Sequence, residues 1–122
     1  IQHMIAIHGG AGTILEEKLD AAQRDEYHAV LKKSLEVGYS CLDGGGSSVE
    51  AVSASISVLE DSILFNAGRG SVFNSKGLIE MDASIMNGKD LSAGAVTCLK
   101  NVKNPKNKNR DLKSILQGPN KS

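Results

Sequence analysis

Two glycine-containing segments hold the residue types that are best suited to chemistry in this sequence. The first follows a short apolar run and reads His8-Gly9-Gly10-Ala11-Gly12, and the second, residues 65–71, reads Phe-Asn-Ala-Gly-Arg-Gly-Ser. Loops of this kind expose many backbone N–H and C=O groups. Such groups can cradle an ion or an oxyanion, or they can form a tight structural turn. The residues by themselves leave both interpretations open.

A nucleotide-binding role for the first loop fails on its spacing. Gly10 and Gly12 supply two glycines of a dinucleotide fingerprint, but Leu15 occupies the third position and no helix is predicted to open there. No Walker A lysine follows either. An α/β nucleotide-binding domain is therefore the weakest of the alternatives.

The histidines and cysteines do not have the spacing of metal ligands. His3, His8 and His28 form no ligand pattern, and neither Cys41 nor Cys98 belongs to a CxxC pair. We interpret His8 as a strand-end histidine that is hydrogen-bonded in the core. The two cysteines are interpreted as small buried hydrophobic residues.

The remaining catalytic candidates are carboxylates and threonines. Glu80 and Asp82 share one face of a predicted strand, about 7 Å apart. Such a pair can carry out acid–base catalysis, and a polar strand face bonded to loop amides explains it equally well. Cleavage before Thr13 would discard the first strand, and Thr97 lies in mid-strand. Both threonines are therefore poor nucleophile candidates.

The elements that position these residues follow from hydrophobic periodicity and turn signals. Ser47 with Glu50 three residues later predicts a capping box at the start of the second helix. The predicted elements are a strand over 5–7, a helix over 19–39, a helix from Ser47 to Glu60, strands over 79–85 and 93–99, and a short helix over 111–117. The last long strand is apolar on both faces, which predicts a central position. The order indicates an α/β (α+β) fold with helices on one face of a sheet.

Composition excludes several classes of protein. The 122 residues carry equal numbers of acidic and basic side chains, which argues against nucleic-acid and membrane partners. Residues 1–102 hold 8 basic and 13 acidic residues, whereas residues 103–122 hold 6 basic and 1 acidic residue. Only four residues are aromatic, so the core is predicted to consist of Ile, Leu, Val, Ala and Met. Two cysteines are too few for a disulfide scaffold, which predicts a cytoplasmic protein.

Several of these motifs occur together in the order and spacing of one family. They are the His8–Gly12 loop, residues 44–52 (GGGSSVEAV), residues 65–72 (FNAGRGSV), residues 80–88 (EMDASIMNG) and residues 93–96 (AGAV). Together they resemble the α-subunit of the plant-type L-asparaginase/isoaspartyl peptidase family. The resemblance covers about residues 4–105. It divides the chain into an α-subunit-like region, 1–105, and an unmatched basic tail, 106–122, expected to be disordered or to form a short helix.

The resemblance implies an N-terminal-nucleophile hydrolase with an αββα sandwich, of which this chain represents the α-subunit part. Members hydrolyse L-asparagine to aspartate and ammonia, and they cleave β-aspartyl dipeptides. Their nucleophile is a threonine that autocatalytic cleavage releases at the N-terminus of the β-subunit, with its own α-amine as the base. The implied partner is a β-subunit or a full-length relative, in a heterodimer that forms a dimer of heterodimers.

The resemblance also assigns supporting residues within this chain. The loop His8, Gly9 and Gly10 would line the cleavage site, and Asn66 would lie near the nucleophile. No organic cofactor is implied, but a structural sodium ion is. Its ligands by similarity are the main-chain carbonyls of Leu59, Glu60, Ser62, Phe65, Ala67 and Arg69, and oxygen ligands suit a hard cation.

The resemblance stops before the nucleophile. After Asn104-Pro105 the sequence no longer matches the family, and the threonine, the oxyanion hole and the substrate-binding residues of the β-subunit have no counterpart. This chain alone is therefore predicted to be inactive. The alternative is a non-catalytic truncated product that binds a full-length relative or a β-subunit.

Overall fold

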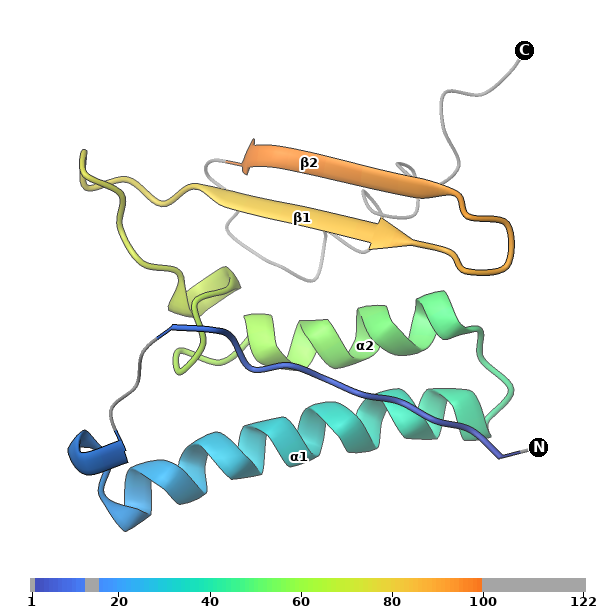
Figure 1. The fold of residues 1–122 in the computed structure, drawn as a ribbon, viewed down its shortest axis with the longest axis horizontal. Helices are drawn as coiled ribbons and strands as arrows, with labels where there is room; N and C mark the ends of the chain where they lie inside the picture. Colours follow the sequence, from blue (N-terminus) through green and yellow to red (C-terminus); the bar gives the residue numbers. More distant parts are fainter. Residues whose placement is uncertain (1, 13–15, 100–122) are drawn as a thin grey trace.

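The computed structural model describes residues 2–12 and 16–99, which form two α-helices, two short 3₁₀ turns and one antiparallel hairpin (Figure 1). The elements are η1 (Glu16–Lys18), α1 (Ala21–Asp43), α2 (Ser48–Glu60), η2 (Gly68–Gly70), β1 (Met81–Met86) and β2 (Ala93–Leu99). This combination confirms the predicted α+β class. The helix predicted over 111–117 lies outside the described residues.

Helix α1 is shifted toward the C-terminus relative to the predicted span 19–39. A capping box holds its start: the Asp20 carboxylate accepts the Gln23 N–H at 2.7 Å, and the Gln23 side chain accepts the Asp20 N–H at 3.1 Å. The helix continues until Gly44, whose N–H donates to the carbonyl of Ser40. Gly45 then takes a φ of +88°, which favours glycine. The glycine run therefore ends the helix.

Helix α2 begins and ends where the sequence predicts. The Ser47 hydroxyl accepts the Glu50 N–H at 3.2 Å, and the Glu50 carboxylate accepts the Ser47 N–H at 2.9 Å. This reciprocal pair satisfies N–H groups that the first turn leaves without a helical partner. The helix ends at Glu60.

The two helices pack closely because small residues face each other. The hydroxyls of Ser34 and Ser55 each donate to the other residue's carbonyl, both at 2.8 Å, and both side chains are buried. Gly38 lies one turn after Ser34, and a Cβ there would overlap the Ser55 hydroxyl. The same Cβ would lie 3.2 Å from the carbonyl oxygen of Ala51. The small residues at this contact therefore allow the two helices to approach closely.

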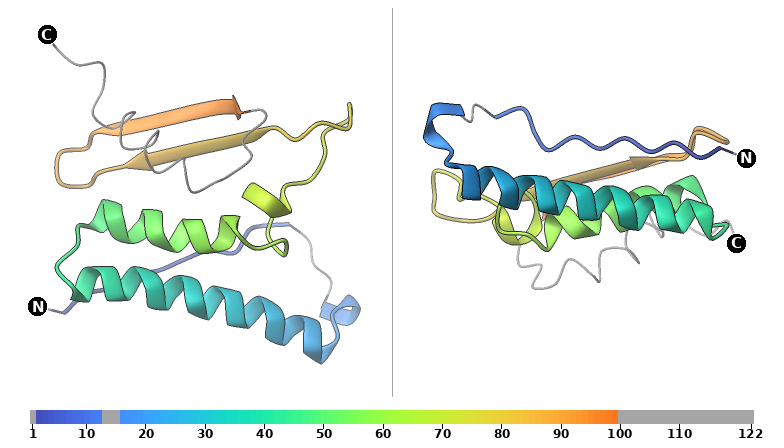
Figure 2. Two further views of the ribbon diagram at one scale, coloured as in Figure 1. Left: turned by 180° about the vertical axis from the view of Figure 1, so that it is seen from behind. Right: turned by 90° about the horizontal axis from the view of Figure 1, so that it is seen from below.

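Residues 2–8 run across the helix pair in an extended conformation (Figures 1 and 2). Ile5 and Ile7 are half-buried, whereas Met4 is 88% exposed, so the side chains alternate as they do in a strand. The strand predicted over 5–7 is nevertheless absent. A β-ladder needs a neighbouring strand, and in the described part of the chain none pairs with this segment.

The hairpin confirms the strand predicted over 93–99 and shifts the strand predicted over 79–85. β2 spans the predicted 93–99, but β1 starts at Met81 rather than at residue 79. Met81, Ala83 and Ile85 share the half-buried face, as their spacing predicts. β1 and β2 pair only with each other within residues 2–12 and 16–99, so the central position predicted for β2 is not formed there.

A six-residue connection links the two strands. The Asn87 N–H donates to the Ser92 carbonyl at 2.8 Å, and the Asp90 carboxylate accepts the Ser92 hydroxyl at 2.7 Å and the Ser92 N–H at 3.0 Å. Both bonds lower the pKa of Asp90, and the bond from the Ser92 hydroxyl has the larger effect. These bonds hold a turn that is longer than a two-residue hairpin loop.

The helices pack mainly on each other, and the hairpin lies alongside α2 on the side away from α1 (Figure 1). The expected layer of helices over one sheet face is therefore wrong for the described residues. Ala51 and Phe65 are their buried apolar residues, so the expected core of large aliphatic residues is also absent there. Phe73 and Ile63 are more than 70% exposed. No helix within these residues has the length and apolar character needed to cross a membrane.

Candidate active site

An open cavity of about 570 Å³ brings the two glycine-containing segments together. The loop His8–Gly12 forms one side, and Phe65, Asn66 and Ala67 form another. Tyr27 of α1, Leu59 and Leu64 complete the lining of the cavity. These segments are far apart in the sequence, so the cavity joins residues that the motifs marked separately.

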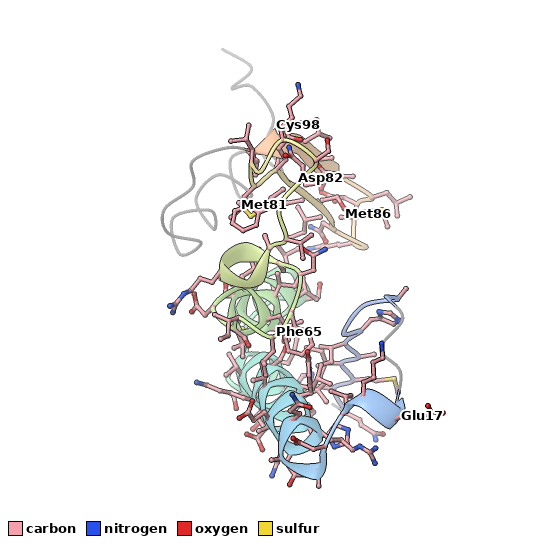
Figure 3. The ribbon with its side chains drawn as sticks, turned by 90° about the vertical axis from the view of Figure 1, so that its left-hand side faces the viewer. Glu17, Phe65, Met81, Asp82, Met86 and Cys98 are labelled. Atoms are coloured by element: carbon pink, nitrogen blue, oxygen red, sulfur yellow. The ribbon has the colours of Figure 1, made fainter. Side chains whose placement is uncertain are left out.

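Phe65 anchors both sides of this cavity. Its ring packs edge-on against Tyr27, with 5.6 Å between the ring centroids, and Figure 3 shows it at the level where α2 meets α1. A Cβ at Gly9 would lie 3.3 Å from the Phe65 ring and 3.5 Å from Leu31. A Cβ at position 9 would therefore make a tight contact with the ring, and the ring or the loop would have to shift slightly. Leu31 lies one turn after Tyr27 on α1, so one face of this helix meets both Gly9 and Phe65.

The side chain of His8 organises the glycine loop. Its Nδ1 accepts the N–H of Gly10 at 3.0 Å, and Gly10 has a φ of +126° that L side chains rarely adopt. His8 itself is exposed. The interpretation of His8 as a core histidine is therefore wrong, although its ring is hydrogen-bonded.

Asn66 is exposed on the opposite side of the cavity. Its side-chain oxygen accepts the N–H of Val72 at 3.0 Å, which ties the start of the loop to the residue after it. The amide NH₂ of the same side chain can donate two hydrogen bonds to a ligand. The contact with Val72 has no signature in the sequence.

The loop from Leu59 to Gly70 curls so that several carbonyl groups approach its own glycines. A Cβ at Gly68, which has a φ of +53°, would lie 2.5 Å from the Glu60 carbonyl oxygen. A Cβ at Gly70 would overlap the Phe65 carbonyl oxygen and lie 2.8 Å from that of Ile63. Only glycine fits at these two positions, and carbonyl oxygens are the kind of ligand that suits a hard cation such as sodium.

Some of these carbonyls also serve the loop itself. Those of Leu59, Phe65 and Ala67 accept N–H groups from Ser62, Ala67 and Gly70 at 3.2, 2.8 and 3.1 Å. Each carbonyl oxygen has two lone pairs, so one such bond still leaves an acceptor position. Ile63 is a nearby carbonyl that the sequence did not single out.

The other candidates from the sequence lie elsewhere. Residues 2–12 and 16–99 contain no group of three or more His, Cys, Asp or Glu side chains that could hold a metal ion. The Asp82 carboxylate accepts the Cys98 N–H at 2.9 Å, and both residues are labelled on the hairpin in Figure 3. Asp82 is therefore bonded to a backbone amide of β2 rather than of a loop, and Glu80 lies outside β1. Cys98 is exposed with a φ of +52°, so its interpretation as a buried hydrophobic residue is wrong, whereas Cys41 is half-buried.

Among residues 2–12 and 16–20, the structure describes no α-helix after the glycine loop. Residues 16–18 form a 3₁₀ turn, and α1 starts only at Ala21 behind its own cap. A dinucleotide site places the pyrophosphate on a helix N-terminus directly after the glycines. The described geometry therefore does not supply that site.

The fold and the cavity define a small α+β domain with a paired glycine-loop site. Over residues 1–112 the sequence matches the protein family described as Asparaginase. The chain therefore belongs to the asparaginase family, which confirms the resemblance drawn from its motifs.

Curated relatives carry a more specific name. The isoaspartyl peptidase/L-asparaginase of Xenopus laevis is 52% identical over 102 residues, and that of Homo sapiens is 46% identical over 103 residues. The protein of the same name from Bos taurus is 44% identical over 102 residues. Each match covers 84% of this chain, but 31% of the Xenopus protein and 32% of the other two. The chain thus spans about a third of the length of these relatives.

Proposed function

We propose that these residues form the α-subunit-like part of an isoaspartyl peptidase/L-asparaginase. The observation that carries the proposal is the single cavity shared by the His8–Gly12 loop and Asn66. The two motifs are far apart in the sequence, and the fold brings them to one cavity. The names of these relatives indicate the substrates, L-asparagine and isoaspartyl peptides.

In the proposed reaction, this chain provides support and a second part provides the nucleophile. The threonine hydroxyl adds to the side-chain carbonyl carbon of asparagine, and its own amine takes the proton. Ammonia leaves with that proton, and water then hydrolyses the acyl-enzyme to release aspartate. Asn66 would offer its amide NH₂ beside the threonine, and the glycine loop would line the site of autocatalytic cleavage. The complete assembly would adopt the αββα sandwich of N-terminal-nucleophile hydrolases.

The test of this function is complementation. We expect hydrolysis of a β-aspartyl dipeptide to appear when the chain is co-expressed with the portion of the Xenopus relative that lies beyond the matched residues. The test variant is Asn66→Ala, which removes the amide from the cavity. It is expected to lower kcat at least tenfold, as loss of one well-placed donor does. Co-elution of both parts without any hydrolysis would contradict the proposed activity.

We also propose a structural sodium ion, and the curled loop from Leu59 to Gly70 is the observation that favours it. The carbonyls of Leu59, Glu60, Ser62, Phe65, Ala67 and Arg69 would hold it. The ion would keep the end of α2 and residues 61–71 in one arrangement, and thereby position Asn66. It takes no part in the chemical step.

Sodium is therefore expected to stabilise the chain more than potassium does. At a concentration ten times its Kd, a ligand that binds only the folded state adds about 1.4 kcal/mol to the free energy of unfolding. Thermal unfolding in NaCl and in KCl at equal ionic strength measures the difference. Identical midpoints in both salts, over the whole titration, would contradict a sodium site.

A non-catalytic binding role is the second candidate, and exposed apolar side chains favour it. Met4, Ile63, Val72, Phe73 and Leu91 are between 64% and 88% exposed. Exposed apolar surface of this kind marks interaction sites. Size-exclusion chromatography with the complementary part separates the two roles, because a purely binding product co-elutes with its partner and the complex hydrolyses nothing.

A further inference from the structure

The glycine loop is closed by an imidazole nitrogen rather than by backbone groups. The Gly10 N–H donates to Nδ1 of His8, two residues earlier in the sequence, at 3.0 Å. For Nδ1 to accept this bond, the ring must be neutral and carry its proton on Nε2. The contact therefore selects one of the two tautomers of His8.

The same local geometry recurs in this chain with amide and carboxylate acceptors. The side-chain oxygens of Asn74, Asn87 and Asp90 each accept the N–H of the residue two positions later, at 2.9 to 3.1 Å. These are Asx-type turns, in which a short side chain imitates a backbone turn. His8 performs the same task with a ring nitrogen in place of an oxygen.

The bond matters because glycines flank the peptide that it holds. A trans peptide is planar, so directing the Gly10 N–H at His8 turns the Gly9 carbonyl away from the ring. A Cβ added at Gly10 would meet nothing within 4 Å. Loss of the His8 acceptor would therefore remove a hydrogen bond that orients the Gly9–Gly10 peptide.

We propose that His8 is a positioning residue that holds the Gly9–Gly10 peptide in one orientation through Nδ1, at the edge of the cavity that it shares with Asn66. Its catalytic consequence rests on the proposed function, whereas the bond itself does not. No direct contact between His8 and substrate is required. An acceptor of similar reach, such as asparagine, is expected to replace the ring.

Nuclear magnetic resonance tests the bond in the 122-residue chain. We expect a scalar coupling between the Gly10 amide nitrogen and His8 Nδ1, and ring ¹⁵N shifts of the tautomer that carries its proton on Nε2. His8→Asn is expected to keep the Gly10 amide in a hydrogen-bonded position, and His8→Ala is expected to shift it. His28→Ala, at an exposed position of α1, is the matched control and is expected to leave Gly10 unchanged. A His8 ring protonated on Nδ1, or the absence of the coupling, overturns the proposal.

The complemented enzyme provides the functional arm. His8→Ala is expected to lower kcat about tenfold, the equivalent of one hydrogen bond, with KM changed less than twofold. His8→Asn is expected to restore most of kcat. Equal loss in both variants overturns the positioning role. An inactive wild-type assembly would refute the proposed function, and the coupling would still decide the role of His8 in the loop.

Discussion

A polypeptide made of these 122 residues, purified by itself, is expected to release no ammonia from L-asparagine above a heat-denatured control. The cavity of His8–Gly12 and Asn66 presents supporting groups, and the proposed nucleophile is a threonine of the complementary part. Loss of a catalytic nucleophile lowers rates by orders of magnitude. A coupled assay for ammonia measures the difference, and the complemented assembly serves as the positive control.

The two threonines of the chain provide the critical comparison. Thr97 lies in β2 with an exposed position, and Thr13 lies outside the described residues. If the chain alone turned over asparagine, and if Thr13→Ala or Thr97→Ala abolished that turnover, the division into supporting and attacking parts would be refuted. We expect both variants to be indistinguishable from the parent chain.

The variant Gly70→Ala is expected to be the most damaging single methyl addition in the site. Its Cβ would overlap the Phe65 carbonyl oxygen and lie 2.8 Å from the Ile63 carbonyl oxygen. Both neighbours are backbone atoms, so relief requires the whole loop to open. We expect a loss of about 1–3 kcal/mol in the free energy of unfolding, the usual cost of overpacking. Urea denaturation measures this loss.

Gly88→Ala is the matched control for that variant. A Cβ at Gly88 meets nothing within 4 Å, and its φ lies outside the left-handed region. This substitution is expected to change the stability by less than about 0.5 kcal/mol. We also expect Gly70→Ala, but not Gly88→Ala, to abolish the stabilising effect of sodium. Equal stability of the two variants would show that the carbonyls do not gather around Gly70.

Sequence patterns predicted the local elements well where the cause is local. The capping box at Ser47 and Glu50 lies within a few residues, and it set the start of α2 correctly. Two-residue alternation placed Met81 and Ile85 on one face of β1. The start of α1 was less well predicted because the cap at Asp20 was not recognised.

Predictions that depend on a distant partner failed more often. The alternation at Ile5 and Ile7 indicated a strand, but no strand pairs with that segment among the described residues. Cys98 has the residue type of a buried position, yet the irregular register of the hairpin leaves it exposed. In both cases a neighbouring chain segment, and not the local pattern, decides the outcome.

The amino-acid sequence by itself determined the family, the cap at the start of α2 and the two glycine-rich motifs, because each depends on residue types at short and fixed spacings. Only the tertiary structure decided that Phe65 supports Gly9, that Ser34 and Ser55 bond reciprocally, and that His8 and Asn66 line one cavity. These contacts join segments more than twenty residues apart. Their geometry depends on how α1 and α2 pack, and no local periodicity specifies that packing.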